Sequence, residues 1–160
     1  MKLEGTFTFN GPRETVWDLL QDPAVLAKTL PGTKRLERAG EDRFEGVMKV
    51  SVGPVTAAEF AVTVTLSDKV APERFAMQID GKGSVGFTRG AASVELDEAP
   101  GGGTLMRYSS DVQVGGRIAA VGQRLIESVA KMMMRQALGA LDRELQARMG
   151  AGAKPPGSKE

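Results

Sequence analysis

The segment from Gly115 to Met149 constrains the fold of this chain more than any other feature. It contains no proline and is predicted to form one amphipathic helix, far longer than the average of about 11–12 residues. Its apolar residues recur at spacings of three and four, which is typical of a helix that buries one face. Most of the chain before it alternates like β-strands. We therefore predict that the helix packs against a sheet, and that a curved sheet leaves an apolar cavity between the two, as in a binding protein.

The composition removes several classes of chemistry. The chain has no cysteine and no histidine, which excludes thiol and imidazole nucleophiles, a Ser-His-Asp triad and the usual ligands of zinc and haem. We predict neither catalytic residues nor a metal site. With 21 basic and 20 acidic residues the chain is nearly neutral, which argues against nucleic-acid binding.

The length fits one domain, expected to span residues 1–149, followed by a flexible tail over residues 150–160 that is rich in glycine and proline. The N-terminus has no signal-peptide pattern, and no run approaches the roughly 18 apolar residues of a membrane-spanning helix. Together with the absence of cysteine, this predicts a cytoplasmic protein.

Alternating polar and apolar residues predict seven β-strands. In the first strand Leu3, Phe7 and Phe9 alternate with polar neighbours, and in the last strand Arg107 points away from the face of Tyr108. Short links between successive strands predict an antiparallel sheet in sequence order. The strands between the first and the last are expected near residues 33–40, 42–52, 55–67, 75–79 and 84–97, and the last near 104–114.

Two short helices are predicted between the first and second strands. Asn10 is expected to cap the first helix, and Asp22, which precedes a proline, is expected to cap the second. Gly81-Lys82-Gly83 is predicted to be a hairpin turn. Gly90-Ala91 suggests a bulge or bend inside a strand. The fold class is therefore α+β, with a seven-stranded antiparallel sheet wrapped around a long C-terminal helix.

This order of elements resembles the helix-grip fold of the START and Bet v 1-like (SRPBCC) superfamily. Two groups of residues resemble the signatures of one family within it, the CoxG family, named after the G subunit of carbon monoxide dehydrogenase, and the resemblance covers roughly residues 1–148. The N-terminal group is Val16-Trp17, Asp22-Pro23, Leu26-Ala27 and Leu30-Pro31-Gly32. The C-terminal group is Gly115-Gly116-Arg117-Ile118-Ala119 with Gly122, Arg124 and Leu125.

The resemblance implies a non-catalytic accessory protein of a molybdenum-containing carbon monoxide dehydrogenase or a related hydroxylase. Such a protein is expected to hold a hydrophobic, quinone- or lipid-like molecule, to need no covalent cofactor, and to help bring the enzyme to the inner face of the cell membrane. Some members continue through a proline-rich linker into a membrane anchor. This chain ends soon after Pro155-Pro156, so either its membrane contact is peripheral or an anchor follows in a longer chain.

Two alternatives remain open at this stage. Some helix-grip relatives are cyclases or aromatases, whose activity depends on pocket shape and a few polar groups. Such an activity here would have to use Tyr108, arginines or carboxylates, and these do not form a convergent set in the sequence. The other alternative is a protein–protein adaptor whose interior is filled by its own side chains.

The predicted ligand contacts are apolar side chains of the sheet, the short second helix and the long helix, although each also fits an ordinary core. Met132 and Met133 are favoured because methionine adapts to varied apolar shapes. Tyr108, the single tyrosine, would either hold a carbonyl oxygen of the ligand or satisfy a buried backbone group. The full set is Leu26, Leu30, Phe60, Phe75, Met77, Phe87, Met106, Tyr108, Leu125, Val129, Met132 and Met133.

Basic residues recur along the long helix. Arg117, Arg124 and Lys131 are seven residues apart, and Arg135 follows closely. This pattern is typical of a solvated helix face, supported by the pair Glu127–Lys131 at a spacing of four. The same strip would also suit contact with anionic lipid head groups or with an acidic partner.

Overall fold

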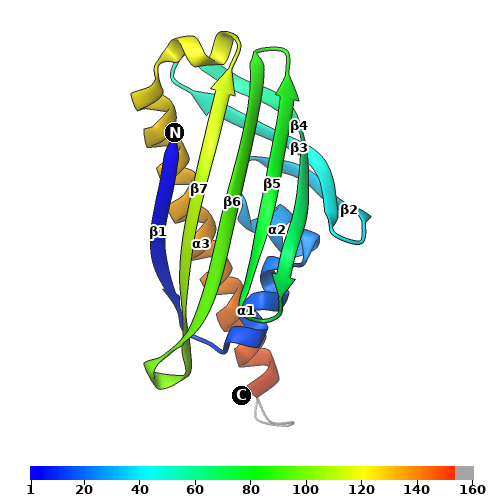
Figure 1. The fold of residues 1–160 in the computed structure, drawn as a ribbon, viewed down its shortest axis with the longest axis vertical. Helices are drawn as coiled ribbons and strands as arrows, with labels where there is room; N and C mark the ends of the chain where they lie inside the picture. Colours follow the sequence, from blue (N-terminus) through cyan, green and yellow to red (C-terminus); the bar gives the residue numbers. More distant parts are fainter. Residues whose placement is uncertain (154–160) are drawn as a thin grey trace.

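The computed structural model describes residues 1–153 and contains one sheet and three α-helices (Figure 1). The sequence prediction of one strand, two short helices, six strands and a long helix is confirmed. The elements are β1 (Lys2–Phe9), α1 (Arg13–Leu20), α2 (Pro23–Thr29), β2 (Thr33–Gly40), β3 (Arg43–Val52), β4 (Val55–Val70), β5 (Arg74–Gly83), β6 (Gly86–Ala99), the 3-10 turn η1 (Pro100–Gly102), β7 (Gly103–Gly115), the 3-10 turn η2 (Arg117–Val121) and α3 (Gln123–Ala153).

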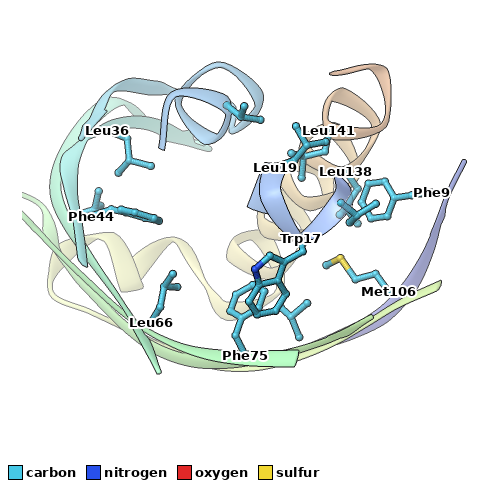
Figure 2. Close-up of a cluster of buried hydrophobic side chains, with 14 of the residues drawn as sticks. Phe9, Trp17, Leu19, Leu36, Phe44, Leu66, Phe75, Met106, Leu138 and Leu141 are labelled. Carbon is cyan, nitrogen blue, oxygen red and sulfur yellow. The ribbon is translucent and has the colours of Figure 1, made fainter. Parts of the chain in front are cut away.

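The sheet is an antiparallel meander from β2 to β7, with β1 added beside β7, so that the strand order is β1-β7-β6-β5-β4-β3-β2. It curves around the helices, which all lie on its concave face (Figures 1 and 2). Two residues of β4, Ala57 and Asp68, have positive φ of 51° and 52°, and the register of β4 shifts near both. Such irregularities bend a strand and increase its twist, which contributes to the curvature.

Part of the core lies where α1 and the second half of α3 meet the concave face (Figure 2). The same cluster continues through Phe60 and Val62 of β4 to Ile118 of η2. The Trp17 ring packs edge-on against the Phe75 ring, with 5.4 Å between centroids. Phe9 and Leu145 are almost completely buried, with 1% and 0% exposure. Apolar residues recur about every 3.6 residues in the helices and every two in the strands, so each element has one apolar face. The apolar faces of the helices and of the sheet meet at this end of the molecule.

The two short helices begin differently from each other. At α2 the Asp22 carboxylate accepts a hydrogen bond of 2.9 Å from the Ala24 N–H, which confirms the predicted cap. At α1 the cap position is Pro12, and no side chain caps the helix, so the prediction for Asn10 was wrong. The Asn10 backbone instead bonds α3: its N–H donates to Asp142, and its carbonyl accepts from Gln146.

The predicted helix from Gly115 to Met149 is interrupted at its start. β7 continues to Gly115, and η2 follows before α3 begins at Gln123. Gly116 and Gly122 have positive φ of 84° and 103°, and an α-helix cannot continue through that conformation. At its other end α3 extends to Ala153, past the predicted boundary at Met149. The rest of the predicted tail lies outside the described residues.

Two predictions for β5 and β6 were also wrong. Gly81-Lys82-Gly83 belongs to β5, and the turn falls at Ser84-Val85. Gly90-Ala91 is not a bulge, because β6 pairs with β5 and β7 without any shift of register there. A β-carbon on Gly90 would lie 3.1 Å from the Val112 side chain. The glycine is therefore explained by close packing within a regular strand.

The convex face of the sheet is polar and carries ion pairs. Arg107 pairs with Glu95 at 3.4 Å, which confirms that this arginine points outward, and Arg89 pairs with Asp80. Lys34 donates a hydrogen bond of 3.1 Å to Glu59 and lowers the pKa of Glu59 from its ordinary value of 4.5. Because the Glu59 pKa is lower in the folded state, the ionised carboxylate adds stability near neutral pH. That stability is lost as the pH falls through the pKa of Glu59.

Candidate functional site

Burial changes along the concave face of the sheet. At the end covered by α1, side chains such as Val94 and Leu96 are buried, with 4% and 1% exposure. Farther along the same face, Val64, Met77 and Ile79 are only half-buried, although they lie on β4 and β5 in the middle of the sheet. Central strands have neighbours on both sides, so the remaining exposure comes from the space above the sheet. The helices therefore do not cover this part of the concave face completely.

The two halves of α3 differ in the same way. In the second half, Leu138, Leu141 and Leu145 are buried, and this half packs on α1 and α2. In the first half, Leu125 and Met132 are 38% and 42% exposed. Ile126, Val129 and Met133 beside them are half-buried. The first half of α3 thus keeps apolar surface that the protein itself does not bury.

A cleft opens between the end of β7 and the start of α3, with a volume of about 510 Å³. We call it the β7–α3 cleft. Val112 and Val114 line it from the strand, and Ala119 and Ile126 from η2 and the helix. Its volume falls within the range of small-molecule sites, about 300–1,000 Å³. The cleft lies at the end of the molecule opposite α1, as the N-terminus and η2 show in Figure 1. Its lining is completed by Met1, Phe87, Gln113 and Gln123.

The residues predicted from sequence to contact a ligand fall into three groups. Phe60, Phe75 and Met106 belong to the buried core. Met77 and Tyr108, on the concave face, are half-buried. Leu26, Leu30, Val129 and Met133 on the helices and their ends are half-buried as well. The exposed group consists of Phe87, Leu125 and Met132.

Phe87 stands apart from the other predicted contacts. Alternation along β6 puts it on the face opposite Val94 and Leu96, and its ring lies over Gly115, where a β-carbon would come within 2.4 Å of the ring. It is 40% exposed and borders the β7–α3 cleft. The prediction that Phe87 lies on the inner face of the sheet was therefore wrong. A period of two shows which residues of a strand share a face, but it does not show which of the two faces is the inner one.

Tyr108 lies on the concave face beside Val94 and opposite Gly5. Its hydroxyl would be 2.7 Å from a β-carbon on Gly5, so the ring extends over that glycine. The absence of a side chain at Gly5 gives the tyrosine its room. The ring is half-buried, and it lies between the closed core and the open part of the concave face.

Several residues of the open region were absent from the predicted contacts. Val112 and Val114 share the concave face with Tyr108 and line the β7–α3 cleft. Val64 and Ile79 pair across β4 and β5 on the same face. The alternation that identified Tyr108 includes all four, so the signal was available in the sequence. The sequence does not show how far along the strands the helices cover the sheet.

The basic strip is shorter than predicted. Arg124, Lys131 and Arg135 are exposed and lie on one side of α3. The Lys131 ammonium pairs with Glu127 at 3.0 Å, as expected from their spacing. Arg117 belongs to η2 and donates a hydrogen bond to the Ser84 carbonyl. Its seven-residue spacing from Arg124 therefore does not place it on the helix.

Two classes of feature are not found within residues 1–153. No three side chains among aspartate, glutamate, histidine and cysteine gather into a potential metal site. No helix in the same part of the chain is both long and apolar enough to cross a membrane.

Solved structures share this fold. A conserved protein from Geobacillus kaustophilus is 27% identical, covers 93% of this chain and 97% of its own, and has a TM-score of 0.87. The Zhui aromatase/cyclase from Streptomyces sp. R1128 is 16% identical over 97% of this chain and 99% of its own, with a TM-score of 0.74. A START superfamily protein from Mycobacterium smegmatis is 12% identical over 91% and 97%, with a TM-score of 0.70. At such low identity the last two similarities show the helix-grip fold alone.

No curated protein matches this chain. The family model of CoxG, the G subunit of carbon monoxide dehydrogenase, matches residues 5–146. That match runs from β1 into the buried second half of α3 and includes both groups of signature residues. The chain is therefore a member of the carbon monoxide dehydrogenase CoxG family, with the helix-grip fold of the START superfamily.

Proposed function

We propose that this protein binds a hydrophobic, quinone- or lipid-like molecule between the concave face of the sheet and the first half of α3. The observation that carries the proposal is the incomplete burial of Val64, Met77 and Ile79 on central strands, opposite a helix whose own apolar residues are exposed. A ligand would cover both surfaces. Burial of apolar surface contributes about 25 cal/mol per Å² before the cost of ordering the ligand is subtracted.

The residues facing this space suit a ligand of variable shape. Met77, Met132 and Met133 have flexible, polarizable side chains that adapt to rings or isoprenoid chains. The Tyr108 hydroxyl is a polar group at the border of the space and can donate a hydrogen bond to a carbonyl oxygen. Leu26 and Leu30 on the other side of the fold, at α2, would border the route of entry.

The protein acts, in this proposal, as a non-catalytic accessory factor of a molybdenum-containing carbon monoxide dehydrogenase or a related hydroxylase. The name of its family supports the link to that enzyme. A bound quinone would accept electrons from the enzyme, and a lipid-like ligand would accompany its recruitment to the membrane. The protein would work in the cytoplasm, in peripheral contact with the inner face of the membrane.

The direct test is mass spectrometry of an organic extract of protein purified from its native host. A stoichiometric isoprenoid quinone or lipid supports the proposal. The second arm adds short-chain ubiquinone and menaquinone analogues to the stripped protein and measures displacement of an apolar fluorescent dye. An empty extract, together with no dye displacement, would contradict the proposal and favour an adaptor. Chemical conversion of the bound molecule would favour an enzyme instead.

Membrane contact is expected to use the basic strip. Arg124 and Arg135 lie on the half of α3 that also exposes Leu125 and Met132, a combination that suits an anionic membrane surface. The double variant Arg124→Glu/Arg135→Glu should bind phosphatidylglycerol vesicles at least about tenfold more weakly, since each basic residue contributes about 1 kcal/mol. Sedimentation with vesicles gives the measurement.

The matched control is Arg74→Glu/Lys82→Glu, which changes the net charge by the same amount on the convex face of β5. Vesicle binding by this control should fall much less. Equal losses in the two variants would mean that total charge alone governs the interaction, and the strip would have no specific role.

A further inference from the structure

A hollow of about 510 Å³ opens on the convex face of the sheet, at the tip of the hairpin that joins β5 to β6. We call it the β5–β6 hollow. The start of η2 completes its wall, at the upper end of the molecule in Figure 1. Among the described residues, its lining includes three basic side chains, one carboxylate and one aromatic ring, namely Lys82, Arg89, Arg117, Asp80 and Phe87. Charged and apolar groups therefore meet at one place on the surface.

The hollow is more basic than the rest of the convex face. Elsewhere on that face, basic and acidic side chains pair with each other across the strands. In the hollow Asp80 pairs with Arg89 at 3.4 Å, which neutralises both. Lys82 and Arg117 are exposed, and no ion pair within residues 1–153 includes either of them. The lining therefore has a net charge of +2, carried by two cations that are free to meet an anionic group.

The position of Arg117 is fixed by contacts between η2 and the hairpin turn. Its guanidinium donates a hydrogen bond of 3.2 Å to the Ser84 carbonyl. Ile118 is buried, with 4% exposure, and its N–H donates to the next carbonyl of the turn at 2.7 Å. A β-carbon on Gly116 would come within 2.6 Å of the Gly86 Cα, so glycine allows the two segments to touch. This part of the C-terminal signature thus holds a cation in place before any partner binds, which lowers the entropy cost of binding.

The Phe87 ring adds apolar surface beside these charges. Phe87 pairs with Lys82 across β5 and β6, so both side chains are on the convex face. The ring lies over Gly115 of β7, where a β-carbon would come within 2.4 Å of it, and it is 40% exposed. A side chain that enters a bilayer has to project from the surface, whereas this ring is held against the neighbouring strand. A hollow with charged sides instead fits a side chain that projects from another protein.

We infer that the β5–β6 hollow docks an acidic segment of a partner protein. An apolar side chain of that segment covers Phe87, and its carboxylates meet Lys82 and Arg117. Arg117 uses one nitrogen for the Ser84 carbonyl and keeps its other N–H donors for a carboxylate. In such an interface the aromatic ring provides contact area, and the charges speed the encounter and select the partner.

The position of the hollow links it to the proposed ligand site. Phe87 borders both the β5–β6 hollow and the β7–α3 cleft, so a protein docked in the hollow lies beside the opening of the cleft. The identity of the partner rests on the proposed function, in which it is the molybdenum hydroxylase. The basic residues Arg124 and Arg135 belong to α3 and are not part of the hollow. They stay available for the membrane while the enzyme is bound.

The test measures binding of the hydroxylase holoenzyme from the same host to the full chain by biolayer interferometry. The variant Lys82→Glu/Arg117→Glu should bind at least about tenfold more weakly, because both positions then repel an acidic segment. Wild-type binding should weaken as salt rises from about 50 to 200 mM, and the variant should lose most of that dependence. The control Arg74→Glu/Arg143→Glu makes the same change of net charge at the far end of β5 and on α3, and should bind like the wild type.

A second variant keeps the contacts of η2 intact. Lys82→Glu/Ser84→Glu reverses the charge of the hollow at two exposed positions and leaves Arg117 and its backbone contact in place. It should lose enzyme binding to a similar extent. Affinity for 2-methyl-1,4-naphthoquinone should be unchanged in both hollow variants, because the hollow is outside the concave face. Binding to phosphatidylglycerol vesicles should fall much less than in Arg124→Glu/Arg135→Glu.

Three results would overturn the inference. If the enzyme binds the wild type and both hollow variants equally, it docks elsewhere, and the proposed function is unaffected. An equal loss in the control would mean that net charge alone governs binding. Loss of vesicle binding with enzyme binding retained would assign the hollow to the membrane. If the wild type does not bind the hydroxylase at all, the partnership in the proposed function fails, and the docking inference fails with it.

Discussion

Replacing Ala92 with leucine is expected to abolish ligand binding without destabilising the protein. Ala92 is half-buried on the concave face of β6, paired with Met77 on one side and Ser110 on the other. A leucine there projects into the space between the sheet and the first half of α3. Affinity for 2-methyl-1,4-naphthoquinone should fall by more than about tenfold, because the ligand and the new side chain would occupy the same volume.

The stability of the Ala92→Leu variant tests the open space independently of any ligand. In a filled core, the larger side chain would cost about 1–3 kcal/mol of unfolding free energy. In an open space it gains apolar contacts, so the melting temperature should be unchanged or higher. A melting temperature several degrees lower would show that the interior is already packed, and would support the adaptor alternative.

Ala91→Leu is the control for this experiment. Ala91 is the preceding residue of the same strand, and it is exposed on the convex face. The substitution is chemically identical, but the side chain points away from the helices. Neither the free energy of 2-methyl-1,4-naphthoquinone binding nor that of unfolding should change by more than about 0.5 kcal/mol. A loss of binding in this variant as well would indicate that β6 tolerates no larger side chain, and would remove the argument from Ala92.

Leu145→Ala is expected to give the largest loss of stability. Leu145 is completely buried, with 0% exposure, in the second half of α3, and its methyl groups lie against Gly11. Truncation leaves a cavity where α3 meets the chain before α1. The unfolding free energy should fall by about 2–5 kcal/mol. Urea denaturation should show a lower midpoint with an unchanged slope, since the native and unfolded states stay equally compact.

Met132→Ala on the first half of the same helix should behave in the opposite way. Met132 is 42% exposed, so its truncation should change the unfolding free energy by less than about 0.5 kcal/mol. Dye or quinone affinity should nevertheless fall, because the methionine contributes apolar surface to the ligand. If Met132→Ala proved as destabilising as Leu145→Ala, the two halves of α3 would not have separate roles.

Much of the fold was predictable from local patterns. Alternation along the strands predicted the seven strands and the outward direction of Arg107, and the short links between strands predicted the antiparallel sheet. Asp22 before a proline predicted the cap of α2. These features depend only on residues that are close together in the chain. Side chains alternate between the two faces of a strand, and the side chain before a helix caps its first N–H groups. A single sequence contains that information directly.

The candidate site was predictable only in part. Methionines and leucines at helical spacing identified α3 as one wall, but Leu145 and Met132 carry the same pattern, and one is buried while the other is exposed. The break between η2 and α3 at Gly122 depends on a positive φ that a helical pattern does not reveal.

Sequence periodicity thus determined which side of each element is apolar, and tertiary structure decided how much of that side the protein covers. Coverage depends on the curvature of the sheet and on the angle at which α3 crosses it. The irregularities of β4 contribute to the curvature, and the place of the helices depends on contacts between distant residues, such as Trp17 with Phe75 and Leu145 with Gly11. The proposed ligand site is the part of the apolar concave face that the helices leave uncovered. It exists only once the sheet and the helices are packed together.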